Sequence, residues 1–451
     1  MKPLLIQMGH LIDPAQKIDG LGSLLIVDGR IARVGEIPPQ PGYEVLLADG
    51  LVVCPGFIDL HCHLRQPGYE DKETIATGTK AAAKGGFTTV CCMPNTNPPL
   101  DNKEAIDYVK KEAEEQGAVR VLPIACVTVG RRGEELVDMY ELASAGIAGF
   151  SDDGSPVKTP KLMKEALENS RAIGLPIIDH CEDTTLTRDG QINEGMVSRE
   201  LKLAGIPAIA EEKGIARDLE ILEQTGGNLH IAHVSTAGSA ELIRQAKKRG
   251  VKVTAEVTPH HLTLTEMEAL GYNTDAKVSP PLRTQQDNRA LVKALREGVI
   301  DIIATDHAPH SEKDKQCDFI RAAFGISVFE TALGSLMQLV HSGQISLSTL
   351  IARLTRDPAR LLQRKDIGTL SIGASADITL IDTQKTWVVD TNDFISKGKN
   401  TPLAGATLKG RVMATLYQGR LVYRDESLKG LLSGVRGAAG KTGEVWQRKL
   451  F

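Results

Sequence analysis

The chain has 451 residues, 41% of them hydrophobic and 24% charged, a composition typical of a globular protein with a large buried core. Its formal net charge of -4 argues against the clustered basic surface that nucleic acid or an anionic membrane requires. No apolar run approaches the roughly 20 residues of a membrane span. We therefore expect a small-molecule ligand, with no nucleic-acid partner and no membrane span.

The start of the chain and its cysteines predict the compartment. The short apolar run near the N-terminus is interrupted at Asp13, unlike the apolar centre of a secretory signal peptide. The seven cysteines include no CxxC pair, and Cys62 and Cys181 lie beside histidines that could bind a metal. Reduced thiols fit the cytoplasm, which is the location that we expect.

The two flanks of the chain differ from its middle. Residues 4–34 and 378–423 contain short β-type runs interrupted by Asp28-Gly29 and Gln418-Gly419, dipeptides typical of hairpin turns. Neither flank is long enough to bury a core alone. We expect residues 1–54 and 366–428 to form one small composite β domain, with 429–451 as a C-terminal extension of unknown role.

Between the flanks, short β-branched runs alternate with longer segments of helical period, which indicates a parallel sheet wrapped by helices. The predicted strands are 57–63, 88–92, 119–126, 147–151, 176–180, 229–233, 251–257 and 301–305. Segments 103–115, 160–173 and 237–248 are predicted amphipathic helices. Eight strands at this spacing predict an α/β fold in which residues 55–365 form a (β/α)8 TIM barrel.

Six side chains that suit a divalent cation lie at or just after the ends of these strands. His61 and His63 are two residues apart in one strand, so their imidazoles point to the same side. All strands of a parallel barrel run one way, so the six side chains converge on its C-terminal edge, where barrel active sites are built. The candidate metal ligands are His61, His63, Asp153, His180, His233 and Asp306.

The ligand types also predict the metal. Imidazole and carboxylate ligands without thiolate favour zinc, with manganese or cobalt as substitutes. Six ligands suffice for two ions if one carboxylate bridges them, so we expect two Zn²⁺ per subunit. Two such ions, two carboxylates and one hydroxide sum to about +1, a charge that would attract an anionic substrate.

Three further side chains near the predicted cation site could bind a substrate carboxylate. Arg65 lies two residues past His63 and offers a planar guanidinium group. Asn95 follows the second predicted strand, and His310 follows the eighth. Each of the three could instead be an ordinary loop residue.

A series of short motifs carries a resemblance to a known family. In order, the chain contains PGFIDLHCHLRQPG, GGFTTVCCMPNTNP, FSDDG, IDHCED, HIAHVST, EVTPHHL, PPLRT and IIATDHAPH. In their order and spacing these motifs resemble those of class I dihydroorotases of the amidohydrolase superfamily, over about residues 4–425.

This resemblance implies the reversible cyclisation of N-carbamoyl-L-aspartate to L-dihydroorotate in pyrimidine biosynthesis, with a hydroxide that bridges two zinc ions. It implies that His61 and His63 bind one zinc and that His180 and His233 bind the other. Asp153 would bridge the ions, where many amidohydrolases use a carboxylated lysine; its neighbour Asp152 is the competing choice.

The resemblance also implies the remaining roles. Asp306 would contact the first zinc and act as the catalytic general acid/base. Ser279 stands where many relatives have asparagine, and it reaches less far. The implied substrate contacts are His63, Arg65, Asn95, Ser279, His310, Phe324 and Gly325.

Several alternatives stay open at this point. A hydantoinase, dihydropyrimidinase or allantoinase would use the same barrel and hydroxide. A non-catalytic scaffold for aspartate transcarbamoylase would usually lack metal ligands, and here all six positions are filled. We expect a homodimer, with the transcarbamoylase as a further candidate partner. Residues 311–319 could form a lid or a plain surface loop. His260 and His261 could be extra metal ligands, but a role that is structural or supports the ligands is favoured.

Overall fold

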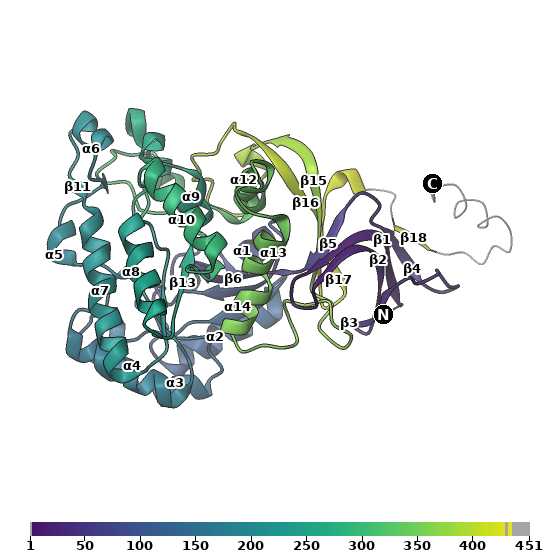
Figure 1. The fold of residues 1–451 in the computed structure, drawn as a ribbon, viewed down its shortest axis with the longest axis horizontal. Helices are drawn as coiled ribbons and strands as arrows, with labels where there is room; N and C mark the ends of the chain where they lie inside the picture. The colour runs from purple at the N-terminus through teal and green to yellow at the C-terminus, as the bar shows by residue number, and fades with distance from the viewer. Residues whose placement is uncertain (1, 429–431, 435–451) are drawn as a thin grey trace.

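The computed structural model describes residues 2–428 and 432–434. It has a helix-rich region at one end and a strand-rich region at the other (Figure 1). Apart from residues 432–434, the expected C-terminal extension 429–451 lies outside the described residues. No helix in the described part of the chain is both long enough and apolar enough to cross a membrane.

The parallel strands of the middle region form two sheets, in the orders β6-β7-β8 and β14-β13-β12-β9. Single parallel bridges connect them: Phe150 pairs with Ala125 and Ile177, and Cys62 pairs with His307. The expected α/β fold is confirmed. The strands are β6 (Phe57–Cys62), β7 (Phe87–Cys92), β8 (Arg120–Pro123), β9 (Ile177–Asp179), β12 (Leu229–Ile231), β13 (Val253–Val257) and β14 (Ile302–Ile303).

One predicted strand of this region is wrong. Residues 147–151 form no strand, and only Phe150 pairs with its neighbours. The N–H of Phe150 donates to Pro176 O at 2.9 Å, and the N–H of Ile178 donates back to Phe150 O at 2.8 Å. On the other side, Ala148 and Ser151 donate to Pro123 O and Ala125 O, so the segment still lies between β8 and β9 although it forms only single bridges.

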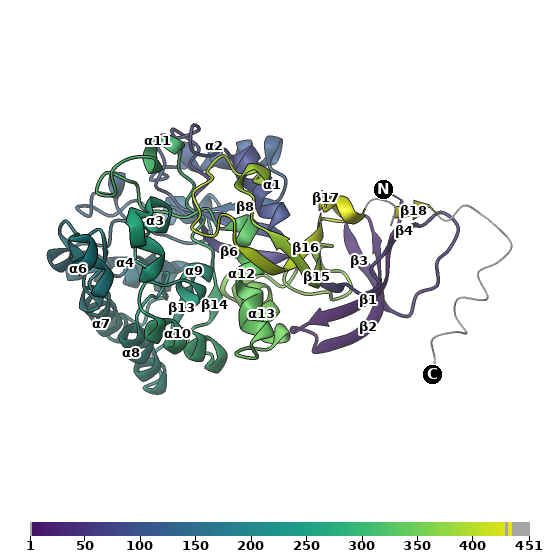
Figure 2. The ribbon, with the colours of Figure 1, turned by 90° about the horizontal axis from the view of Figure 1, so that it is seen from above.

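Helices surround these strands, as Figures 1 and 2 show, and several begin and end at favourable caps. Thr159 caps α4 and Gly174 ends it in the left-handed conformation, while Thr284 and Asp287 form a capping box on α10. The longer helices are α1 (Ile75–Lys84), α2 (Lys103–Gln116), α4 (Pro160–Ile173), α7 (Ala208–Thr225), α8 (Ala237–Lys248), α10 (Gln285–Glu297), α12 (Phe329–His341) and α13 (Leu347–Leu354).

Short elements fill the loops between them. The short helices are α3 (Met139–Ser144), α5 (Thr184–Thr187), α6 (Met196–Leu201), α9 (Pro259–Thr263), α11 (Glu312–Lys315) and α14 (Arg356–Leu361). A two-stranded sheet pairs β10 (Ile192–Asn193) with β11 (Gly205–Ile206). The 3-10 turns are η1 (Val129–Arg131), η2 (Glu266–Tyr272), η3 (Thr274–Ala276), η4 (Thr391–Asp393) and η5 (Glu426–Leu428).

Strands from both flanks share one nine-stranded sheet. Within it, β15 pairs antiparallel with β5, and this pair joins the C-terminal flank to the N-terminal one. Both predicted hairpin turns are confirmed, because β2–β3 and β16–β17 are antiparallel pairs. The strands are β1 (Leu4–Asp13), β2 (Ile18–Val27), β3 (Arg30–Gly35), β4 (Glu44–Leu47), β5 (Val52–Pro55), β15 (Ile378–Val388), β16 (Thr407–Tyr417), β17 (Arg420–Arg424) and β18 (Leu432–Gly434).

Candidate active site

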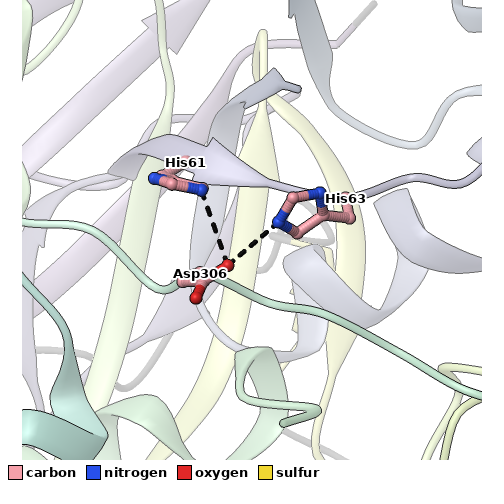
Figure 3. A group of neighbouring side chains, drawn as sticks. All are labelled: His61, His63 and Asp306. Carbon is pink, nitrogen blue, oxygen red and sulfur yellow. Dashed lines mark hydrogen bonds and ion pairs between the residues drawn. The ribbon is translucent and has the colours of Figure 1, made fainter. Parts of the chain in front are cut away.

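The six predicted metal ligands lie together at the C-terminal ends of the parallel strands. His61 is in β6, His63 and Asp306 follow β6 and β14, and all six side chains are buried. In Figure 3, His61 and His63 both point toward Asp306. The Asp306 Oδ1 atom lies 2.9 Å from His63 Nε2 and 3.5 Å from His61 Nε2.

Asp153 occupies the middle of this cluster. Its carboxylate oxygens lie 3.5 Å from His61 Nε2, 3.6 Å from His63 Nε2, 3.7 Å from His180 Nδ1 and 3.3 Å from His233 Nε2. Contact with all four imidazoles is the geometry that a bridging ligand requires.

The neighbouring carboxylate, Asp152, points elsewhere. It accepts hydrogen bonds from the backbone N–H of Val127 at 2.9 Å and of Thr128 at 3.2 Å, and from the Thr128 hydroxyl. Asp152 therefore holds the loop after β8, and Asp153 is the residue that faces the histidines.

The donor set fits divalent cations. Ligand atoms of His61, His63 and Asp306 lie within 4.8 Å of one another, as do those of His61, Asp153 and His233. Among the described residues, buried His61 Nε2 has no hydrogen-bond partner, although two carboxylate oxygens lie 3.5 Å from it. His180 joins the second set through a 3.0 Å contact between its Nδ1 and His233 Nε2. Imidazole and carboxylate ligands of this kind suit zinc and its substitutes.

The charges of the cluster support the same conclusion. Burial opposes the ionisation of Asp153 and Asp306, but the charge of His61 helps to outweigh it, and the pKa of each carboxyl falls below its usual value. Burial also opposes protonation of His61, but nearby carboxylates, Asp153 foremost, raise its pKa well above the usual value. The carboxylates thus stabilise a positive charge beside them, and a bound cation would supply it in place of the proton.

Arg65 and His310 lie next to each other at the edge of the cluster. Arg65 Nη2 is 3.2 Å from His310 Nε2, and Arg65 Nε donates to Pro309 O at 3.1 Å. His310 Nε2 also lies 2.8 Å from Phe324 O, which it can reach as a donor. Burial and the charge of Arg65 lower the pKa of His310 to about 2, so its ring is neutral near pH 7. The structure thus brings together three of the predicted substrate contacts.

Three other predicted substrate contacts, Asn95, Gly325 and Ser279, differ in their surroundings. Asn95 Oδ1 accepts from His63 Nδ1 at 2.9 Å, which leaves His63 Nε2 facing Asp306. Gly325 has φ 144, and an added Cβ would lie 2.9 Å from His310 Nε2, so the backbone passes close to that ring. Ser279 is half-buried, and its hydroxyl makes no hydrogen bond within the described part of the chain.

Two buried lysines hold the segment 311–319 and the residues after it. Lys315 Nζ donates to the carbonyl oxygens of Thr274, Lys277 and Ala323 at 2.9, 3.2 and 2.7 Å. Lys277 Nζ donates to Phe319 O at 2.8 Å and lies 4.5 Å from the centre of the Phe324 ring. A lid made from this segment stays a prediction, and opening it would break these bonds.

Near the cluster lie one residue that the sequence did not indicate and two whose roles it did not decide. Glu256 contacts both His61 and His230, and the available signal was a charged residue inside the buried strand β13. His261 lies 2.8 Å from Thr258 Oγ1 and 3.0 Å from Pro280 O, which is a structural role. His260 is buried, and neither of its ring nitrogens has a hydrogen-bond partner in the part of the chain that the structure describes.

Comparison with solved structures supports the fold. The chain matches the L-hydantoinase (dihydropyrimidinase) from Arthrobacter aurescens with a TM-score of 0.85 and 26% identity, over 94% of this chain and 96% of that one. It matches the dihydropyrimidinase from Brevibacillus agri NCHU1002 with a TM-score of 0.82 and 23% identity, over 94% and 95% of the two chains. The second likeness concerns the fold alone.

Sequence comparison is more specific. A family model described as dihydro-orotase-like matches residues 50–239. The curated dihydroorotase of Syntrophus aciditrophicus is 48% identical over 425 residues, which are 94% of this chain and 100% of the relative. That of Pelotomaculum thermopropionicum is 50% identical over 428 residues, again 94% and 100%. The chain therefore belongs to the dihydroorotase family.

Proposed function

We propose that this chain catalyses the reversible cyclisation of N-carbamoyl-L-aspartate to L-dihydroorotate. The observation that carries this proposal is the near full-length similarity to curated dihydroorotases. The site agrees with it, because a guanidinium group lies beside six buried ligands of the kind that cyclic amidohydrolases use. A carboxylate-bearing ring suits Arg65 better than the uncharged ring of a hydantoin does.

The fold that we propose for this activity is a closed (β/α)8 barrel over residues 55–365, with a composite β domain of residues 1–54 and 366–428. The two parallel sheets and the single bridges between their edges support closure of the barrel. The β5–β15 pair supports the composite domain, since it joins strands from both flanks.

We propose that this site holds two Zn²⁺ ions. His61, His63 and Asp306 would hold one ion, and His180 and His233 the other, with Asp153 between them. Bound cations would lower the pKa of a coordinated water and polarise the carbonyl group that is attacked. The chain's own residues would then bind the substrate, orient it and move its protons.

Asp306 is the proposed general acid/base. In ring opening it would accept a proton from the attacking water and deliver it to the ring nitrogen as the carbon–nitrogen bond breaks. In ring closure it would take a proton from the carbamoyl nitrogen as that bond forms and return it to the departing carboxylate oxygen, which leaves as water with a second proton from solvent. Its burial and its 2.9 Å contact with His63 Nε2 support this role.

Arg65, Asn95 and His310 would bind the substrate carboxylate that takes no part in the reaction. Within the described residues, Arg65 bonds through Nε to Pro309 O and contacts His310 through Nη2, and Asn95 bonds through Oδ1, so Arg65 Nη1 and the Asn95 amide nitrogen can donate to a substrate. His63 would contact the substrate from the side of the metal ions, and the backbone at Phe324 and Gly325 would contact the substrate's ring. Holding the flexible N-carbamoyl-L-aspartate by its carboxylate lowers the entropic cost of closing it into a six-membered ring. Ser279 would contact the substrate's ring only if the ring lies close to it, because its side chain is shorter than the asparagine of many relatives.

An activity assay on the purified full chain tests the proposal. We expect interconversion of N-carbamoyl-L-aspartate and L-dihydroorotate in both directions, with hydantoin, dihydrouracil and allantoin turned over much more slowly. Preferred turnover of one of those rings would replace the proposed function by that of a hydantoinase, dihydropyrimidinase or allantoinase. Metal analysis separates the scaffold alternative, which predicts fewer than about one ion per chain. The homodimer, the transcarbamoylase partner and the cytoplasmic location stay predictions.

A further inference from the structure

A buried carboxylate lies behind His61, on the side away from Asp153 and Asp306. Glu256 Oε1 is 2.7 Å from His61 Nδ1, and its Oε2 is 3.0 Å from His230 Nε2. All three residues have 0% exposed surface. His230 is held in turn by a 2.8 Å contact between its Nδ1 and Thr254 Oγ1. Both carboxylate oxygens of Glu256 are therefore fixed by imidazole rings.

This contact determines which nitrogen of His61 carries a proton. Each oxygen of the Glu256 carboxylate lies within hydrogen-bond distance of an imidazole nitrogen, at 2.7 Å from His61 Nδ1 and 3.0 Å from His230 Nε2. An ionised carboxylate only accepts hydrogen bonds, so His61 must donate from Nδ1. In the neutral ring the lone pair is then on Nε2, which is the buried atom without a hydrogen-bond partner.

Because of its position, the orientation of His61 affects both groups of candidate ligands. His61 belongs to both three-residue groups whose ligand atoms converge, one with His63 and Asp306 and one with Asp153 and His233. Glu256 Oε1 also accepts from the backbone N–H of His233 at 3.4 Å. One carboxylate from β13 thus supports two of the proposed ligands.

We propose that Glu256 is a positioning residue for the metal centre, which fixes the tautomer and the ring plane of His61 and strengthens its Nε2 as a donor. His230 and Thr254 hold Glu256 in place from the other side. Carboxylates that accept from metal-bound imidazoles act in this way in metalloproteins generally. The inference rests on the metal centre of the proposed function.

The test measures metal affinity on the metal-stripped full chain. Glu256→Gln keeps the size of the side chain and removes its charge, and Glu256→Asp keeps the charge but withdraws it from His61 by one methylene. The control is Glu266→Gln, because Glu266 is also buried and accepts from Asn193 Nδ2 at 2.6 Å but contacts no residue of the cluster. Competition of Co²⁺ and Zn²⁺ against a chromophoric chelator gives the affinity, and the visible absorption of bound Co²⁺ reports the ligand geometry.

We expect both Glu256 variants to bind Co²⁺ and Zn²⁺ about 10- to 100-fold more weakly than the wild type and to shift the Co²⁺ absorption. Glu266→Gln should change neither. Circular dichroism corrects each affinity for the folded fraction, and if Glu256→Gln does not fold, Glu256→Asp carries the same prediction. Unchanged affinity and an unchanged spectrum in a folded Glu256 variant would overturn the inference. A wild-type chain that binds no Co²⁺ or Zn²⁺ would instead overturn the metal centre itself.

Discussion

The ligand cluster at the ends of the parallel strands and the nine-stranded flank sheet are both buried, but they are stabilised by different means. The flank sheet encloses aliphatic side chains such as Ile6, Leu24, Leu380 and Leu416, each with no exposed surface. The cluster buries four imidazoles and two carboxylates within a few ångströms of one another. Burying apolar groups is favourable in itself, whereas burying charges is costly unless they are paired.

The contrast assigns folding stability to the apolar flank sheet and the proposed chemistry to the ligand cluster. The flank sheet contributes to folding whether or not a ligand is present. The cluster could balance its charges with a bound cation, and His61 Nε2 has no hydrogen-bond partner among the described residues. Four experiments should separate the two regions further, and they follow from the largest expected effect to the smallest.

Removing metal should abolish turnover and loosen only the cluster. A cation present at 100 times its Kd stabilises the folded chain by about 2.7 kcal/mol, and a chelator removes this contribution. Hydrogen exchange should then speed up at the ends of β6 and β12 and stay unchanged in β1 and β15. Readdition of Zn²⁺ should restore both properties. Equal acceleration in the flank sheet would mean that the two regions are not separable.

Asp306→Ala should lower kcat by about 10²- to 10⁴-fold, because it removes the proposed general acid/base. Metal analysis should still find bound ions, since five proposed ligands remain, and substrate should still bind. The control is Asp366→Ala, a partly exposed carboxylate paired with Arg364 rather than with a ligand. Near-normal kcat in Asp306→Ala would remove this residue from the general-base role.

Leu380→Ala should destabilise the chain by about 2–5 kcal/mol, because it leaves a cavity in the flank core. Denaturant unfolding of the metal-loaded chain measures this change. The kcat of the folded fraction and its metal content should match the wild type. The matched control is Ile372→Ala, since Ile372 is 70% exposed and its truncation should cost little. A large fall in kcat for Leu380→Ala would show that the flank sheet shapes the site.

Arg65→Lys should raise KM for N-carbamoyl-L-aspartate about 10-fold, which corresponds to about 1.4 kcal/mol. Lysine keeps the charge but loses the planar two-point contact with a carboxylate. Initial rates over a range of substrate concentrations separate KM from kcat, and kcat should change less than KM does. An unchanged KM would place the substrate carboxylate away from Arg65.

Much of the site was predictable because its geometry follows from local rules. Alternation along a strand places His61 and His63 on one side, and parallel strands bring their C-terminal ends to one edge. These rules led to the six candidate ligands, which the structure brings together. The individual roles of these residues came from the family resemblance and stay proposals.

Other features depended on neighbours that are distant in the sequence. The strand expected at 147–151 is reduced to single bridges from Phe150 to Ala125 and to Ile177, which lie in segments on either side of it. Asp152 and Asp153 are equivalent as residue types. Only the loop at Val127 and Thr128 decides that Asp152 is bonded elsewhere and that Asp153 faces the histidines.

By itself, the sequence determined the α/β fold, the hairpin turns of the flanks and the set of candidate ligands, since each depends on periodicity, turn residues or spacing within a short segment. Only the tertiary structure decided which carboxylate lies among the imidazoles and that Glu256 lies behind His61. Those two facts join strands that are far apart in the chain. Contacts of this kind depend on how the strands pack and not on any local pattern.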